Sequence, residues 1–276
     1  MDIDPLAESP APRHAIESDE EEDEYNPLHT QPVTHCAPLD IQIVGNIASV
    51  PSLVIATGSV AKYWARGADL GEQVATVAVD KIQVGLLFRP AWTQAAVLVS
   101  EVSTRLPLWA MRAYTRAVLG AIKPTDVALL DAYAASVYIS DARTTFVDAP
   151  LRYLSTSAPS TTLSSAAQPF ATPNLVQSTS AAFVAHRAEQ SASATLLLVP
   201  APHITPPAPR ELSSSDYSLS GDTTSWSSAH VRTAHALLFA ELGEQVASTW
   251  KEPPAEKPTA GRARKRPIDT DIGMYI

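Results

Sequence analysis

The sequence predicts an α/β protein, built as a single three-layer domain in which helices flank a mixed β-sheet. Short segments rich in branched apolar residues and bounded by Gly, Asn or Pro are typical of buried strands. These segments alternate with longer amphipathic segments that have helical spacing, and such alternation is typical of layered α/β architecture. Neither an internal repeat nor a clear internal boundary divides the pattern.

Seven segments have the character of strands. A pair of them, separated by Asp80 and Lys81, has the pattern of a hairpin. The seven expected strands cover residues 41–47, 51–58, 73–80, 82–90, 95–102, 126–134 and 194–200.

Four segments have helical character, and they cover residues 59–67, 107–122, 175–190 and 225–250. The first ends at Gly67, which is expected to be its C′ residue. The second has Pro107 in its first turn and one apolar face, formed by Leu108, Met111, Thr115, Leu119 and Ile122. The last has an apolar stripe of Val231, Ala234, Leu238, Leu242 and Val246 and is expected to end before Pro253.

The chain is expected to have disordered ends and two mobile loops. Residues 1–38 form an acidic leader, whose run from Glu17 to Glu24 repels itself and stays solvated. The α/β domain spans 39–250, and the Ser-, Thr-, Ala- or Pro-rich stretches 155–174 and 200–224 predict mobile loops within it. Residues 251–276 form a flexible tail.

Composition excludes several classes of partner. The formal net charge of −9 argues against nucleic acid, because phosphate backbones favour a basic protein face. The sequence lacks an uninterrupted apolar run long enough to span a bilayer, so no membrane contact is expected. A single cysteine, Cys36, fits a reducing compartment, and the default location is the cytoplasm or nucleus.

A search for catalytic or metal-binding residues finds little. The sequence lacks a nucleophile elbow, a phosphate loop and a zinc-protease motif. Gly58 and Ser59 stand at a strand-to-helix junction where backbone N–H groups can hold an anion, although a tight turn with Ser59 as N-cap is favoured. His230 and His235 are five residues apart and do not share a helical face as zinc ligands do. We therefore predict no catalytic residue, no metal and no cofactor.

Two further sequence features have either a specific function or only a solubilising role. The basic cluster of Arg262, Arg264, Lys265 and Arg266 fits a nuclear-import signal or a solvated linker. Ser18, which is followed by acidic residues, fits a phosphorylation site for an acid-directed kinase, while the leader as a whole also fits a solubilising segment.

The C-terminus has the character of a ligand. Met274, Tyr275 and Ile276 are apolar or aromatic, yet they follow a solvated Pro- and Lys-rich stretch. The terminal carboxylate offers a fixed charge to a lysine, and Tyr275 offers a flat apolar ring with a hydroxyl. A short anchor on a long tether suits docking into a larger partner.

These features resemble the proteasome assembly chaperone 1 family, as a fungal-type member. A hydrophobic residue, then Tyr, then any residue is the C-terminal motif with which proteasome activators and some assembly chaperones dock between α subunits of the 20S core particle. The acidic leader and the stretch "PSLVIATGSVAKYW" are similar to that family as well. So is "QPFATPNLVQSTSAAFVAHRAEQSASATLLLVP", in which Pro173, Asn174, Leu175 and Val176 hold a characteristic phrase.

The resemblance implies a non-enzymatic chaperone whose fold is similar to that of nucleoside phosphorylases. It implies a heterodimer with a second assembly chaperone, and binding to 20S α subunits through Met274, Tyr275 and Ile276. Such a pair promotes α-ring assembly and blocks premature docking of activators. Two alternatives remain: a nucleoside- or phosphate-processing enzyme of related fold, and a nuclear adaptor protein.

Overall fold

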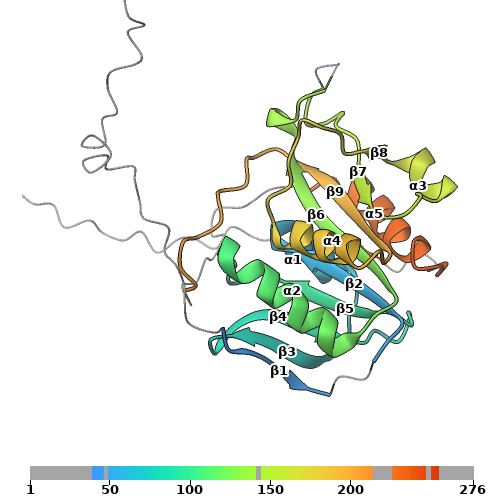
Figure 1. Ribbon diagram of the computed structural model, residues 1–276. Helices are drawn as coiled ribbons and strands as arrows, with labels where there is room; N and C mark the ends of the chain where they lie inside the picture. The colour runs from blue at the N-terminus through green and yellow to red at the C-terminus, as the bar shows by residue number, and fades with distance from the viewer. Residues whose placement is uncertain (1–38, 47–48, 141–143, 214–225, 247–249, 255–276) are drawn as a thin grey trace, which may run out of the picture. The chain divides into compact units, whose positions relative to one another are not determined.

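The structure, a computed structural model, describes residues 39–46, 49–140, 144–213, 226–246 and 250–254. In this part of the chain nine strands form one sheet, with the order β1-β3-β4-β5-β2-β6-β9-β7-β8 (Figure 1). The strands are β1 (Ile41–Gly45), β2 (Ser52–Thr57), β3 (Gln73–Val79), β4 (Ile82–Phe88), β5 (Ala96–Ser100), β6 (Asp126–Ala134), β7 (Arg152–Ser155), β8 (Gln168–Pro169) and β9 (Ala194–Ala201). All seven strands expected from the sequence are present.

The sheet is mixed, with a parallel centre. Strands β5, β2, β6 and β9 are parallel neighbours, whereas β1, β3 and β4 continue the sheet on one side in antiparallel pairs. Asp80 and Lys81 join β3 to β4 as the sequence predicts, with φ of 49° and 67°. On the other side β7 runs antiparallel to β9 and carries the short strand β8.

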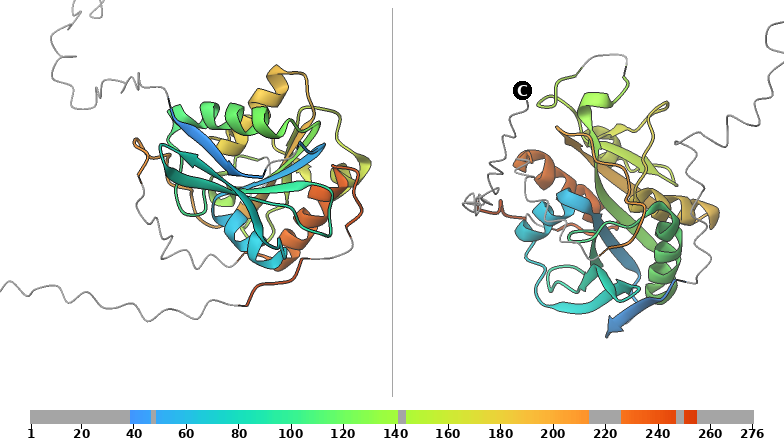
Figure 2. Two further views of the ribbon diagram at one scale, coloured as in Figure 1. Left: turned by 90° about the horizontal axis from the view of Figure 1, so that it is seen from below. Right: turned by 90° about the vertical axis from the view of Figure 1, so that its left-hand side faces the viewer.

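Helices cover both faces of the sheet, which confirms the three-layer prediction. They are α1 (Gly58–Gly67), α2 (Leu108–Ile122), α3 (Thr161–Ala166), α4 (Thr179–Glu189) and α5 (Ser228–Ala240), with a 3-10 turn η2 (Ala135–Val137). In Figure 2, α1 and α5 lie on one side of the sheet, and α2 and α4 lie on the other. None of the described helices is long and apolar enough to cross a membrane.

Strand β2 shows why two cores form. Its residues are all buried, and successive side chains of a strand point to opposite faces. Leu53 and Ile55 therefore enter the core beneath α2 and α4, while Val54 and Ala56 enter the core beneath α1 and α5. A continuous apolar run is thus the sequence pattern that a strand with helices on both faces requires.

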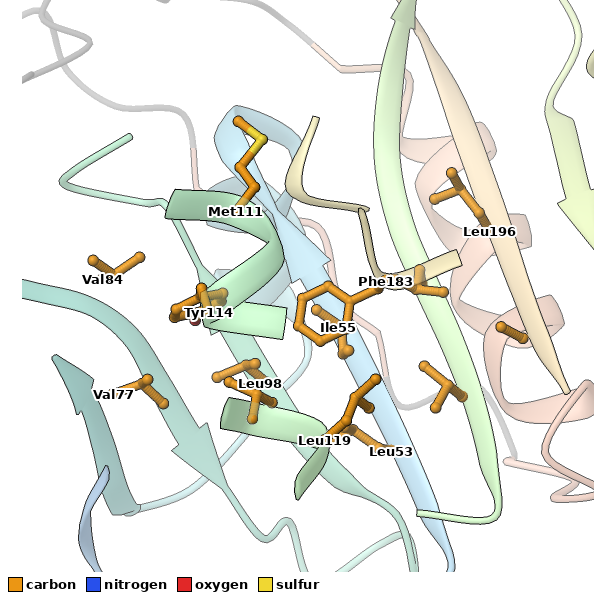
Figure 3. Packing of buried hydrophobic residues seen from close by; sticks show 14 of the residues in the cluster. Leu53, Ile55, Val77, Val84, Leu98, Met111, Tyr114, Leu119, Phe183 and Leu196 are labelled. Carbon is orange, nitrogen blue, oxygen red and sulfur yellow. The ribbon is translucent and has the colours of Figure 1, made fainter. Parts of the chain in front are cut away.

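Tyr114 lies at the centre of the first core. Its ring packs edge to face on Phe183, with centroids 6.2 Å apart, and so joins α2 to α4. Its hydroxyl is 2.9 Å from the Ser100 hydroxyl, which satisfies the buried polar atom. Figure 3 shows this ring among Val77, Val84 and Leu98, between α2 and the sheet.

The helix at the C-terminal end is shorter than the sequence predicts. Helix α5 ends at Ala240, not near residue 250, because Gly243 adopts a φ of 75° that turns the chain out of the helix. The Glu244 carboxylate then accepts hydrogen bonds from the Thr93 hydroxyl at 2.5 Å and from the Gln94 amide. Leu242 and Val246, expected in the helical stripe, are only partly buried.

The predicted loop at 155–174 is also wrong in part, because this segment holds α3 and β8. The Ser160 hydroxyl caps α3 by accepting a hydrogen bond from the Leu163 amide at 3.0 Å, and the Leu163 side chain is fully buried. In the other predicted loop, 200–224, the described residues after Ala201 form neither a helix nor a strand, and 214–224 lie outside the described residues.

Two helix starts differ in detail from the predictions. Helix α4 begins at Thr179, because Ser178 is its N-cap and accepts a hydrogen bond from the Ala181 amide. In α2, Pro107 is the N-cap residue, and Leu108 is 61% exposed, so Leu108 does not belong to the buried face. The other four residues predicted for that face are buried.

Candidate functional site

The residues predicted from sequence to bind partners lie outside the described residues. These are the docking residues Met274, Tyr275 and Ile276, the basic cluster Arg262, Arg264, Lys265 and Arg266, and Ser18. Their roles stay predictions. The structure does describe where the C-terminal segment leaves the domain, and it describes an exposed surface built around the phrase 173–176.

The base of the C-terminal segment is fixed to α1 by Trp250. This side chain is 2% exposed, and its indole N–H donates to the Trp64 carbonyl at 3.0 Å. The Lys251 amide donates to the Gly67 carbonyl at 2.9 Å. A Cβ at Gly67 would lie 2.2 Å from the Lys251 carbonyl oxygen. Gly67 is therefore the last residue of α1 and not a left-handed C′ residue; a glycine stands there because the incoming chain leaves no room for a side chain.

An apolar patch lies between two loops at the end of the sheet that carries β7 and β8. It consists of Val137, Ile139 and Leu175, which are 54%, 63% and 82% exposed; Val137 lies two residues before Ile139, and Asn174, next to Leu175, bonds to the Ile139 backbone. Val147, which is 81% exposed, belongs to the same β6–β7 connection as Val137 and Ile139. A local concentration of exposed large apolar side chains is typical of a surface that another protein covers.

Asn174 holds the two loops of the apolar patch together. Its amide nitrogen donates to the Ile139 carbonyl at 2.8 Å, and its amide oxygen accepts from the Ile139 N–H at 2.8 Å. The same amide nitrogen donates to the Ala171 carbonyl at 3.0 Å. Both polar ends of one side chain thus pair with the backbone of the other loop, so Ile139 and Leu175 are presented in a fixed arrangement.

An aromatic cluster supports the apolar patch from below. The Arg152 guanidinium lies 3.7 Å from the Tyr138 ring centroid, a cation–π distance. Tyr138 packs edge to face on Phe170 at 5.3 Å, and its hydroxyl accepts from the Ala171 N–H at 3.0 Å. Arg152 is 6% exposed and donates to the Pro169 carbonyl at 3.1 Å. These contacts rigidify the segment that carries Val137 and Ile139.

The Gly58–Ser59 junction differs from the sequence-based interpretation. Gly58 has a φ of 72°, as a tight turn requires, but the N-cap of α1 is Thr57 rather than Ser59. The Thr57 hydroxyl is 2.6 Å from the Ser180 hydroxyl at the start of α4. The junction therefore faces the first turn of α4 in a buried polar cluster at the carboxyl ends of the parallel strands.

Two carboxyl groups in this buried cluster argue against an anion site. Burial raises the pKa of Glu101, and the nearby Asp131 raises it further. Burial likewise raises the pKa of Asp131, against hydrogen bonds that include Ser178, Ser180 and Thr57. A site that binds phosphate needs cations or N–H donors, whereas this cluster contains two carboxyl groups. The geometry thus disfavours a phosphate-processing enzyme at Gly58 and Ser59.

Glu101 is the residue that sequence analysis missed. Its carboxylate accepts the Leu106 N–H at 2.6 Å, which closes the turn between β5 and α2. The one local signal for Glu101 is its place directly after a buried strand, where the residue adopts a φ of 56°.

The His235 side chain has a structural environment. The His235 ring is 1% exposed and lies 5.5 Å from Trp92 and 5.1 Å from Phe239, while its Nδ1 accepts the Trp64 indole N–H at 3.1 Å. Burial lowers its pKa to about 4. Within the described residues, no three His, Cys, Asp or Glu side chains gather as metal ligands do.

Comparison with known proteins gives structural likenesses only. No protein-family model matches the sequence, and no curated protein matches it. Among solved structures, Pyrococcus furiosus PbaA, an archaeal homologue of proteasome-assembly chaperone, matches with a TM-score of 0.46 and 10% identity over 75% of this chain and 88% of PbaA. Pyrococcus furiosus PbaB, an archaeal proteasome activator, matches with a TM-score of 0.46 and 9% identity over 76% of this chain and 91% of PbaB.

A bacterial protein shows a weaker likeness. The Mycobacterium tuberculosis proteasome-assembly chaperone homologue Rv2125 matches with a TM-score of 0.34 and 10% identity, over 55% of this chain and 75% of Rv2125. Likenesses at this level assign neither a family nor a function to the chain.

Proposed function

We propose that this protein is a non-enzymatic proteasome assembly chaperone that works as a heterodimer with a second chaperone. The observation that carries the proposal is the apolar patch. Its most exposed residue, Leu175, and its clamp, Asn174, belong to the sequence phrase that resembles the assembly chaperone family. A surface that is apolar, exposed and fixed in shape suits a lasting protein partner, because little conformational entropy is lost when that partner binds.

Two separate contacts divide the work in this proposal. The apolar patch binds the second chaperone, which has an apolar surface of its own. The C-terminal residues Met274, Tyr275 and Ile276 dock between α subunits of the 20S ring, as the hydrophobic–Tyr–X motif suggests. The pair then promotes α-ring assembly and, while docked, occupies pockets that activators use. The protein works in the cytoplasm and nucleus.

The contact with the second chaperone is tested by pull-down from cells that express the tagged full chain. Leu175→Asp places a charge on the apolar patch, and we expect loss of the second chaperone from the captured material. Leu175 is 82% exposed, so folding stability should change by less than about 0.5 kcal/mol. The matched control is Val44→Asp on the edge strand β1, where Val44 is 63% exposed. Equal capture of the second chaperone by both variants contradicts the assignment.

The contact with the α-ring is tested in the same cells with Tyr275→Ala and with deletion of residues 274–276. We expect both variants to lose α subunits and to keep the second chaperone, which is the opposite of Leu175→Asp. If α subunits are captured as well as by the unaltered chain, the tail is not the anchor. Replacing Arg264, Lys265 and Arg266 by Ala and imaging the tagged protein tests nuclear import independently of both contacts.

A further inference from the structure

A basic hollow lies at the C-terminal ends of α2 and α4. Both helices lead directly into parallel neighbouring strands, β6 and β9. The C-terminal ends of the helices therefore meet where these two strands begin. The hollow has a volume of about 450 Å³. It is lined by Arg116, Leu119, Lys123, His186, Arg187 and Gln190, among others. This site is at the opposite end of the parallel strands from the Gly58–Ser59 junction.

The charge around the basic hollow is opposite to that of the chain as a whole. The sequence carries a formal net charge of −9, yet none of the residues that line the hollow is acidic. The nearby carboxylates act on two other lining residues: Asp126 acts on Arg187, and Glu189, which pairs with Arg112 at 3.2 Å, lies 3.8 Å from His186 Nδ1. The side chains of Arg116 and Lys123 make no hydrogen bond or ion pair with any described residue; the Lys123 backbone N–H donates to the Leu119 carbonyl. Two cations therefore face the hollow uncompensated.

Polar groups inside the hollow also have unused bonding capacity. The His186 ring is largely buried, but its Nδ1 has no hydrogen-bond partner among the described residues and lies 3.8 Å from the Glu189 carboxylate. Arg187 uses three of its five N–H donors on the carbonyls of Pro124, Thr125 and Ser193. Two N–H donors of Arg187 therefore remain for a group bound in the hollow.

Helix dipoles account for only part of this arrangement. Cations are favoured near helix C-termini, which explains the presence of basic residues here. A cation at any exposed position in the last turn gains this favourable interaction. The helix dipole therefore does not require Arg116, Lys123 and Arg187 to line one concave surface together. Their convergence from two helices provides several charged donors for one compact, multiply charged anion.

We propose that this basic hollow binds a phosphate group carried by a small molecule. Its volume falls within the range of about 300–1,000 Å³ that is typical of small-molecule pockets. Arg116 and Lys123 supply the charge, and Leu119 and Pro124 supply an apolar wall for the rest of the ligand. The site is separate from the apolar patch and from the C-terminal tail, so it stands or falls independently of the chaperone function.

Titration calorimetry of the full chain with inorganic pyrophosphate tests the proposal. We expect a dissociation constant of about 1 mM or tighter. Replacing Arg116 and Lys123 by Gln should weaken binding by about tenfold or more, because charge-assisted hydrogen bonds are lost. The matched control removes two exposed cations elsewhere, with Arg232→Gln and Lys251→Gln. Undetectable pyrophosphate binding, or equal weakening by the control pair, overturns the proposal.

Gly120 offers a second pair of variants that does not depend on removing charge. Apart from the backbone of α2 itself, no atom lies within 4 Å of a Cβ built at this residue, so a side chain fits there. Gly120→Glu places a carboxylate in the hollow and should abolish pyrophosphate binding, whereas Gly120→Ala should preserve it. A hexaglutamate peptide distinguishes the alternative ligand. Binding of that peptide without binding of pyrophosphate overturns the phosphate assignment in favour of an acidic protein segment.

Discussion

Protonation of His235 is expected to destabilise the fold, and the structure sets the size of the effect. Its Nδ1 accepts the Trp64 indole N–H, so an added proton would place two donors against each other. Burial lowers the pKa to about 4 from 6.5. Because the unfolded chain takes up this proton more readily, stability is complete above about pH 6.5 and falls as the pH drops toward 4. The loss is roughly 2 kcal/mol at about pH 5 and about 3 kcal/mol at pH 4.

Urea denaturation between about pH 7.5 and 5 measures this loss when the chain is compared with His235→Asn. Asn keeps an acceptor near the Nδ1 position but does not titrate. The variant loses ring contacts and is less stable at every pH. Between about pH 7.5 and 5, however, its free energy of unfolding should fall by roughly 2 kcal/mol less than that of the unaltered chain. Glu101, Asp131 and His230 titrate in both proteins, so their contributions cancel. An identical pH dependence in the two proteins would refute the reasoning.

Further predictions concern glycines and the base of the tail. Gly120→Ala should stabilise α2 by roughly 0.5–1 kcal/mol, because the helix gains a better former in open space. Gly85→Ala should lower the free energy of unfolding by about 1–3 kcal/mol, since the new Cβ would lie 2.5 Å from the Tyr114 hydroxyl. If the urea midpoints of Gly120→Ala and Gly85→Ala shift in the same direction, these two predictions are contradicted. Trp250→Ala should cost about 3–5 kcal/mol through the lost core contacts and the bond to Trp64, and an unchanged thermal midpoint would show that the anchor is not stabilising.

The sheet could be predicted from sequence because its signals are local. In β2 every residue is buried, so the strand appears as the apolar run Leu53–Ala56 between Pro51 and Gly58. In β3 and β4 the apolar segments are separated by the two residues that form the turn. Patterns of this kind are present within a few residues of chain and do not depend on distant contacts.

The elements that were predicted wrongly depend on distant partners. Helix α3 has one fully buried apolar residue, Leu163, whose burial depends on elements far along the chain. The end of α5 is followed by the bonds from Glu244 to Thr93 and Gln94, about 150 residues away in sequence. Such contacts leave no periodic trace in the local sequence.

The candidate surface could be predicted from sequence only in part, for the same reason. The phrase 173–176 was noted as a resemblance, but its physical role depends on Asn174 reaching Ile139, 35 residues earlier. The exposure of Ile139 and Leu175 follows from that pairing and cannot be read from two separate apolar residues. The basic hollow likewise requires α2 and α4 to end side by side, where the neighbouring strands β6 and β9 begin, and the strand order determines this.

The two contacts of the proposed chaperone begin on opposite faces of the sheet. Trp250, at the base of the tail, packs in the core beneath α1 and α5. Tyr138 and Phe170, which support the apolar patch, pack against the core beneath α2 and α4. The residues from which the tail departs and those that support the apolar patch thus belong to different layers of the domain. Under the proposed function, variants of the two contacts are therefore expected to act independently of each other.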